Sequence, residues 1–230
     1  MSSKVWMSSV LSNHNVDMKQ GARTKFFGRE WSPASLEIPL SPDDVHAASR
    51  RHREGFALER SEFPEAIAVW DRKRFKKVKE IFMAGPFYAV QDKLAEVLAR
   101  FDLEEGGLIP FPIYEADLET PYPGKFFLLN FGCRKNTLLP DQSEKISKFV
   151  VEKKTGVQFW KVDDWVKDPV VLDAEALRGP DLWFEEVLYN KIFLSDALVQ
   201  ALRAVKLDEP WMLKQCKVKE QGNINTGEAA

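Results

Sequence analysis

One short apolar run constrains the fold of this chain more than any other stretch. Residues 126–129 read Phe-Phe-Leu-Leu without a polar interruption, between a Pro-Gly pair at 123–124 and a glycine at 132. A half-exposed strand alternates polar and apolar residues, whereas a continuous run bounded by turn residues is typical of a strand buried on both faces. We therefore expect this strand to be central in its sheet, with a neighbouring strand on either side.

Two segments match each other without a gap and indicate a repeated unit. They are residues 87–103, FYAVQDKLAEVLARFDL, and residues 191–207, KIFLSDALVQALRAVKL. Each has apolar residues, then a polar residue and an aspartate, then leucines at matching positions, which predicts a short strand followed by a helix with a buried leucine stripe. Each leads into a further β-like run, at 108–114 and 211–218. The sequence therefore predicts an α+β fold, a mixed or antiparallel sheet with two similar strand–helix–strand units packed together; the alternative is coincidence, since amphipathic helices resemble one another.

Local signals predict several further elements. The tetrapeptide SPDD at 41–44 is typical of a helix start, and Gly55 is the expected stop. We expect a strand from about Ala66 to Trp70 and an amphipathic helix over residues 72–79. The run 108–114 can be a strand only at an edge or a bulge, because its two prolines lack the backbone N–H that a central strand donates.

Composition and charge exclude several classes of protein. At 230 residues the chain can hold one large domain or two small ones, and its formal net charge of −2 gives no general attraction to nucleic acid or to an anionic membrane. No apolar run approaches the roughly 18 residues that span a bilayer, and the first residues lack the apolar core of a secretory signal, so we expect cytoplasmic residence. We expect Cys133 and Cys216 to be inert thiols, and we expect no metal and no cofactor.

Three stretches carry a family resemblance: residues 85–117, 126–144 and 181–207. The first matching feature is an aromatic–aliphatic strand that leads to a helix start, Phe87 to Leu94, and the second is an aromatic strand that ends in Leu-Asn, Phe126 to Asn130. A lysine, Lys135, then precedes an Asp-x-Ser turn, Asp141 with Ser143. Last, an Asp-Leu-Trp segment, Asp181 to Trp183, precedes a second strand and helix, Ile192 to Leu198. Over roughly residues 85–218 the chain thus resembles immunity protein family eleven of bacterial polymorphic toxin systems.

The resemblance implies a non-catalytic function. A protein of this kind binds the toxin domain encoded beside it and keeps that toxin inactive in the producing cell, with no reaction and no cofactor. The resemblance implies an immunity-type α+β core at residues 81–220. It does not cover residues 1–80, which we expect to be a variable N-terminal region packed on the core, and the polar, small residues at 221–230 predict a disordered tail. Within the N-terminal region we expect an edge strand from Val5 to Val10.

The distribution of carboxylates suggests where such a toxin would bind. Many toxins of these systems are nucleases, whose basic active sites an inhibitor can occupy with carboxylates in place of phosphates. Residues 102–120 contain six acidic residues and no lysine or arginine. We therefore expect toxin-binding residues among Glu104, Glu105, Glu115, Asp117 and Glu119, with Asp163, Asp164 and Trp165 as a second candidate. The alternative is a solvated acidic face that balances the basic run at 72–79.

Two other functions remain open from the sequence. Lys135, Asp141 and Ser143 could form an unfamiliar enzyme site, since these residue types support nucleophilic or proton-transfer chemistry. However, an aspartate and a serine after a proline commonly bond their own backbone in a turn. A nucleic-acid-binding adaptor could use the basic residues between Arg72 and Lys79, but the region at 102–120 is strongly acidic.

Overall fold

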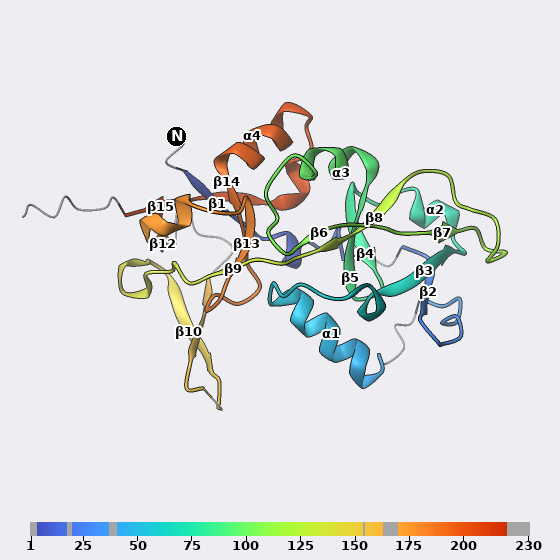
Figure 1. Ribbon diagram of the computed structural model, residues 1–230, viewed down its shortest axis with the longest axis horizontal. Coiled ribbons are helices and arrows are strands. Elements are labelled where there is room, and N and C mark those ends of the chain that lie inside the picture. Colours follow the sequence, from blue (N-terminus) through green and yellow to red (C-terminus); the bar gives the residue numbers. More distant parts are fainter. Residues whose placement is uncertain (1–3, 18–19, 37–40, 154, 163–169, 220–230) are drawn as a thin grey trace, which may run out of the picture.

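The computed structural model describes residues 4–17, 20–36, 41–153, 155–162 and 170–219. Within these residues the chain is a mixed α+β protein in which strands predominate, as expected (Figure 1). The α-helices are short. The described residues also form short 3-10 helices at Val10–Ser12, Arg60–Glu62, Pro140–Gln142, Ala174–Leu177 and Glu209–Trp211. No helix in the described part of the chain is both long and apolar enough to cross a membrane.

The predicted central strand lies inside a four-stranded antiparallel sheet. This strand, β8 (Phe126–Asn130), pairs with β5 (Phe87–Gln91) on one side and with β6 (Gly107–Pro110) on the other, and β4 (Ile81–Ala84) pairs with β5. Leu128 and Leu129 are fully buried, as their position in a continuous apolar run predicts. β6 is the edge of this sheet, which agrees with the restriction that its proline imposes.

The run 108–114 forms two strands rather than one. β6 ends at Pro110, and β7 (Ile113–Tyr114) joins a different, three-stranded sheet with β3 (Pro64–Val69) and β2 (Ala22–Phe26). Pro112 lies at the break and cannot donate a backbone hydrogen bond. The prolines therefore pass the chain from one sheet to the next.

A six-stranded sheet contains most of the C-terminal half, and its third strand comes from the N-terminus. The order is β12 (Val171–Leu172), β15 (Leu213–Val218), β1 (Val5–Ser8), β14 (Ile192–Ser195), β13 (Leu182–Glu185) and β9 (Arg134–Lys135). The expectation of an edge strand at residues 5–10 is wrong. All four residues of β1 pair antiparallel with both β14 and β15, whose residues lie about 185 to 210 positions further along the chain. Val5, Met7 and Ser8 are buried between these neighbours.

Two helices follow matching strands and pack together. α3 (Asp92–Leu98) follows β5, α4 (Asp196–Ala204) follows β14, and the two lie side by side over the sheets (Figure 1). Their leucine stripes belong to one apolar cluster, in which Leu94, Leu98, Leu198 and Leu202 are fully buried. The Ser195 hydroxyl accepts a hydrogen bond from the backbone N–H of Leu198 and so caps α4.

The N-terminal half supplies two more helices, one as expected and one shorter. α1 (Asp43–Arg53) begins at the predicted tetrapeptide, and the chain turns at Gly55, whose φ is +85° and whose Cα lies against Phe184. The expected helix over 72–79 is a single turn, α2 (Arg72–Phe75). Asp71 caps that turn, and the buried Phe75 anchors it before the chain leaves for β4 at Ile81.

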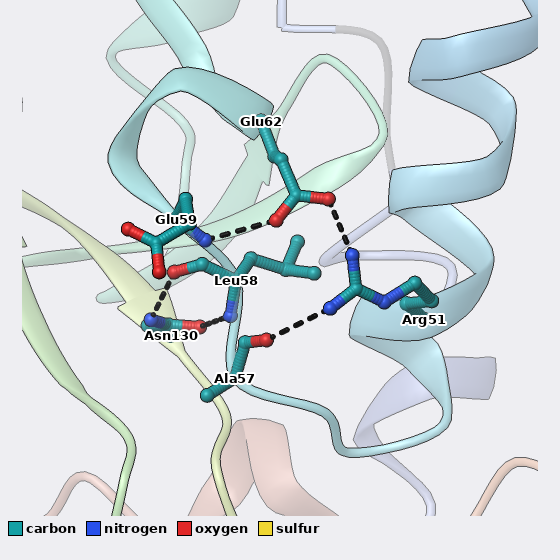
Figure 2. A network of polar contacts seen from close by, with 6 residues as sticks. All are labelled: Arg51, Ala57, Leu58, Glu59, Glu62 and Asn130. Atoms are coloured by element: carbon teal, nitrogen blue, oxygen red, sulfur yellow. Dashed lines mark hydrogen bonds and ion pairs between the residues drawn. The ribbon is translucent and has the colours of Figure 1, made fainter.

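The segment between α1 and β3 is fastened to the end of the central strand (Figure 2). The side chain of Asn130, the last residue of β8, bonds both backbone groups of Leu58. On the outer side of the same segment, Arg51 of α1 forms an ion pair with Glu62 and donates to the Ala57 carbonyl. These contacts join α1 to the four-stranded sheet.

Candidate protein-binding surface

A two-stranded hairpin projects from the body of the protein beside the six-stranded sheet (Figure 1). Its strands are β10 (Ile146–Val151) and β11 (Gln158–Val162), and they pair antiparallel with each other. Every residue of β10 except Ile146 is exposed. Phe149, Val150 and Val151 are 46%, 50% and 51% exposed, so a strand with the composition of a core strand faces solvent.

Apolar side chains are exposed on both faces of the hairpin. Successive residues of a strand point to opposite faces, so Val150 and Val151 expose apolar atoms on each side. Val157, just before β11, is also exposed. An isolated two-stranded hairpin is marginally stable, and exposed apolar surface beyond single scattered residues is typical of a protein-interaction site. We call the exposed apolar residues here the hairpin surface: Phe149, Val150, Val151, Val157 and the neighbouring Tyr189.

A bulge and an aromatic pair fix the position of Phe149. The pairing of β10 with β11 shifts between Lys148 and Val150, which leaves Phe149 as the extra residue. Its ring centroid lies 4.6 Å from that of Tyr189. Tyr189 is held in turn, because its backbone N–H donates to the Trp160 carbonyl of β11 at 2.8 Å. The hairpin is therefore attached at Trp160 to the chain that follows β13.

The hairpin surface has a basic border. Residues 144–162 contain five lysines and two glutamates, in a chain whose overall formal charge is −2. Lys145, Lys148, Lys153 and Lys161 are exposed, and the Lys161 ammonium lies 5.9 Å from the centre of the Phe149 ring. The local field around the apolar residues is therefore positive.

A cavity of about 590 Å³ separates the hairpin from α1. Arg50 lines it from α1, Arg134 from β9, and Phe159 from β11; Phe56 and Tyr189 also contribute. The guanidinium of Arg134 stacks on the ring of Phe56 at 4.2 Å from its centre. Its ion contact with Glu186 is long at 3.9 Å, and no other ion pair of Arg134 is found among the described residues. The cavity thus combines aromatic walls with incompletely paired arginines.

The lining of this cavity includes a buried carboxylate, Glu185, that sequence reasoning did not single out. Glu185 is 3% exposed and accepts hydrogen bonds from the Thr137 and Leu138 backbone N–H groups and from the Thr137 hydroxyl. Burial raises the pKa of Glu185 to about 7, although these hydrogen bonds oppose the shift. Its position at the end of an apolar strand was a signal, since a glutamate there must find partners when it is buried. Here the carboxylate holds the loop after β9 against β13.

The expected acidic residues lie in two groups, one before β6 and one after β7. Glu104 and Glu105 precede β6, and the Glu104 carboxylate contributes to the raised pKa of the Cys133 thiol. Glu115, Asp117 and Glu119 follow β7, where Glu115 pairs with Arg72 at 2.6 Å. Asp117 accepts hydrogen bonds from Thr120 and from the Glu119 backbone, and these lower its pKa. The second candidate, Asp163, Asp164 and Trp165, lies outside the described residues.

The residues of the alternative enzyme site serve separate structural contacts. The Lys135 ammonium lies 3.7 Å from the centre of the Trp183 ring and donates to the Arg178 carbonyl; burial lowers its pKa. The Ser143 hydroxyl donates to the Leu139 carbonyl and accepts from the Val171 N–H, while Asp141 is exposed. Within the described ranges, no hydrogen bond or ion pair joins these three side chains to one another.

Both cysteines are free and buried. Burial raises the pKa of the Cys133 thiol to about 12, and the adjacent Glu104 carboxylate acts in the same direction. A thiol with so high a pKa carries almost no thiolate at neutral pH, so Cys133 is a poor nucleophile.

Comparison with known proteins adds no assignment. A scan against models of protein families found no match to this chain, and a search of curated proteins found none either. The resemblance described above therefore stays a prediction, and the surface features carry the functional argument.

Proposed function

We propose that this protein acts by binding another protein in a stoichiometric complex, and that its partner is a toxin domain which it neutralises in the cell that makes both. The observation that carries the binding function is the hairpin surface, where Phe149, Val150 and Val151 are each about half exposed on a projecting strand. The nature of the partner rests on the resemblance of the sequence to immunity proteins.

The hairpin surface has the components that protein interfaces use. Aromatic residues dominate the binding energy of most interfaces, and Phe149 and Tyr189 provide an aromatic pair that is already in contact before binding. The basic border would surround the apolar centre with charge that directs encounter. Durable inhibition needs a Kd of about 1 nM or below, and an interface of roughly 800 Å² on each partner is typical of such complexes.

We further propose that two strand–helix–strand units of the same design make up the body of the protein. The strand order β4-β5-β8-β6 corresponds to β13-β14-β1-β15, every neighbouring pair in each set is antiparallel, and α3 and α4 follow the second strand of each. The hairpin lies in the connection between the units. Its strands pair with no strand of either set among the described residues, so it is free to specialise in binding.

The expected acidic residues form a second predicted surface for the toxin. Glu104 and Glu105 are exposed, as are Asp117 and Glu119; the first pair precedes β6 and the second follows β7. A partner that used all of them would have to contact both groups. This surface lacks exposed large apolar residues, which are needed for the centre of a tight interface, and we therefore rank the hairpin surface first.

The test is a titration of the purified chain with the toxin domain encoded by the adjacent reading frame. We expect a one-to-one complex with nanomolar affinity, and loss of toxin activity at one equivalent. Micromolar affinity, or toxin activity that persists at saturation, would contradict the proposal. Sedimentation of the chain alone is the control, because a dimer that forms through the hairpin surface would assign that surface to self-association.

A further inference from the structure

Two arginines that line the cavity between α1 and the hairpin are incompletely paired among the described residues. Arg50 is exposed and its side chain forms no ion pair or hydrogen bond with the residues that the structure describes. The Nε atom of Arg134 is buried and has no hydrogen-bond partner within the same residues. The neighbouring Arg51 differs, because it pairs with Glu62 and donates to the Ala57 carbonyl. Incompletely paired guanidinium groups therefore line the cavity from α1, through Arg50, and from β9, through Arg134.

The acidic residues that line the cavity do not fully pair with Arg50 and Arg134. Glu186 approaches Arg134 only to 3.9 Å, whereas a charge-assisted N–H···O bond is about 2.7–2.9 Å long. The carboxylate of Glu185 is occupied by Thr137 and Leu138. Glu54 and Glu152 also line the cavity, but neither pairs with an arginine within the described residues. An incoming carboxylate would find free donors here.

The surroundings would strengthen such a contact. Phe56, Phe159 and Tyr189 line the same cavity, and Arg134 is already stacked on Phe56. Aromatic walls exclude part of the water that would otherwise screen a guanidinium–carboxylate pair. Tyr189 belongs both to the cavity lining and to the hairpin surface, since it contacts Phe149. One segment of a bound partner can therefore contact both the cavity and the hairpin surface.

We propose that this cavity binds an aspartate or glutamate side chain of the partner protein, next to apolar partner residues that cover the hairpin surface. The proposal deepens the protein-binding function and rests on it. It gives the partner a defined chemistry: a contact surface that is acidic and apolar, complementary to Arg50, Arg134 and the lysines that border the hairpin.

The first test uses the toxin domain and two single variants, Arg50→Gln and Arg134→Gln. We expect each variant to bind at least about tenfold more weakly than the parent, because a buried carboxylate would lose a charged partner. Arg100→Gln is the matched control, since Arg100 is exposed just beyond α3, away from the cavity lining. Parent-like affinity in both cavity variants, with tight binding by the parent, would overturn the inference but leave the proposed function intact. Thermal melts confirm that each variant is folded.

The second test does not need the toxin. Random peptides displayed on phage are selected on the immobilised full chain, and the enriched peptides are then measured against Arg50→Gln and Arg134→Gln. We expect enrichment of an acidic residue flanked by apolar residues, with binding at least about tenfold weaker in the variants. No enrichment, enrichment of basic or uncharged peptides, or unchanged binding in the variants would overturn the inference. Binding to phosphatidylserine vesicles that requires Phe149 would also overturn it, because the surface would then serve a membrane.

Discussion

The side chain of Asn130 exchanges two hydrogen bonds with the backbone of Leu58, one in each direction. Its Oδ1 accepts from the Leu58 N–H at 3.0 Å, and its Nδ2 donates to the Leu58 carbonyl at 2.9 Å (Figure 2). All these groups are buried, and the two residues are 72 positions apart. The side chain of Asn130 thereby satisfies the backbone N–H and carbonyl of Leu58, which a neighbouring strand would otherwise bond.

Asn130→Asp should destabilise the protein strongly. A carboxylate cannot donate to the Leu58 carbonyl, and it would leave a buried charge facing that oxygen. We expect a loss of about 2–4 kcal/mol in the free energy of unfolding, measured by urea denaturation at pH 7. Asn136→Asp, at an exposed position six residues later, is the control and should cost little. Equal denaturation midpoints for the two variants would contradict the role assigned to Asn130.

The leucine stripes of α3 and α4 should contribute similarly to stability. Leu98 and Leu202 are both fully buried in the same cluster. We expect Leu98→Ala and Leu202→Ala each to lower the free energy of unfolding by about 2–5 kcal/mol, through lost burial and a residual cavity. Leu177→Ala removes a leucine that is 43% exposed and should have a small effect. A parent-like melting temperature for either helix variant would count against the two-unit arrangement.

Glu185 should make stability depend on pH in a defined direction. Its pKa is about 7 in the folded protein against 4.5 for an ordinary glutamate, so the folded state holds the proton over a range in which the unfolded chain has lost it. Stability is therefore lost as pH rises from about 4.5 to about 7. Glu185→Gln keeps the shape and the acceptor oxygen but does not titrate.

The measurement for Glu185 compares the two proteins across that range. We expect the free energy of unfolding of the parent, relative to Glu185→Gln, to fall by up to about 3 kcal/mol between pH 4 and pH 8. Parallel pH profiles would show that Glu185 titrates normally. Glu175→Gln, at an exposed position, controls for the loss of one carboxylate from the chain.

The sequence predicts those parts of the fold that depend on residues close together in the chain. The position of β8 inside its sheet, the start of α1 and the edge position of β6 follow from apolar runs, capping residues and prolines, which act on their own neighbourhood. The insertion of β1 between β14 and β15 does not, because four residues of mixed polarity carry no information about partners so distant. The fold therefore joins ends of the chain that no local pattern connects.

The same limit applies to the candidate site. The segment Phe149-Val150-Val151 has the composition of a buried strand, and nothing in it indicates that the body of the protein leaves it uncovered. Burial depends on tertiary neighbours, so an apolar run predicts a need for a partner but not whether that partner is part of the same chain. The carboxylates, by contrast, are conspicuous in the sequence but lie in two separate groups in the structure.

Charge reversal separates the acidic residues from the hairpin surface. If the hairpin surface and its basic border bind the toxin, the pair Glu104→Lys with Glu105→Lys should leave the association rate within about twofold at low salt, since these residues lie outside the interface. The pair Lys148→Glu with Lys161→Glu should slow association markedly, and high salt should reduce the difference. If only the pair Glu104→Lys with Glu105→Lys slows association, the toxin binds at the acidic residues and not at the hairpin surface.

The most direct test of the central claim is isothermal titration of the toxin domain with Phe149→Ser and with Val205→Ser. Phe149 and Val205 are 46% and 49% exposed, but only Phe149 belongs to the hairpin surface. We expect Phe149→Ser to weaken binding by about 2 kcal/mol or more, as the loss of an aromatic anchor does, and Val205→Ser to bind like the parent. Parent-like affinity for Phe149→Ser, or an equal loss in both variants, would contradict the claim that the hairpin holds the partner.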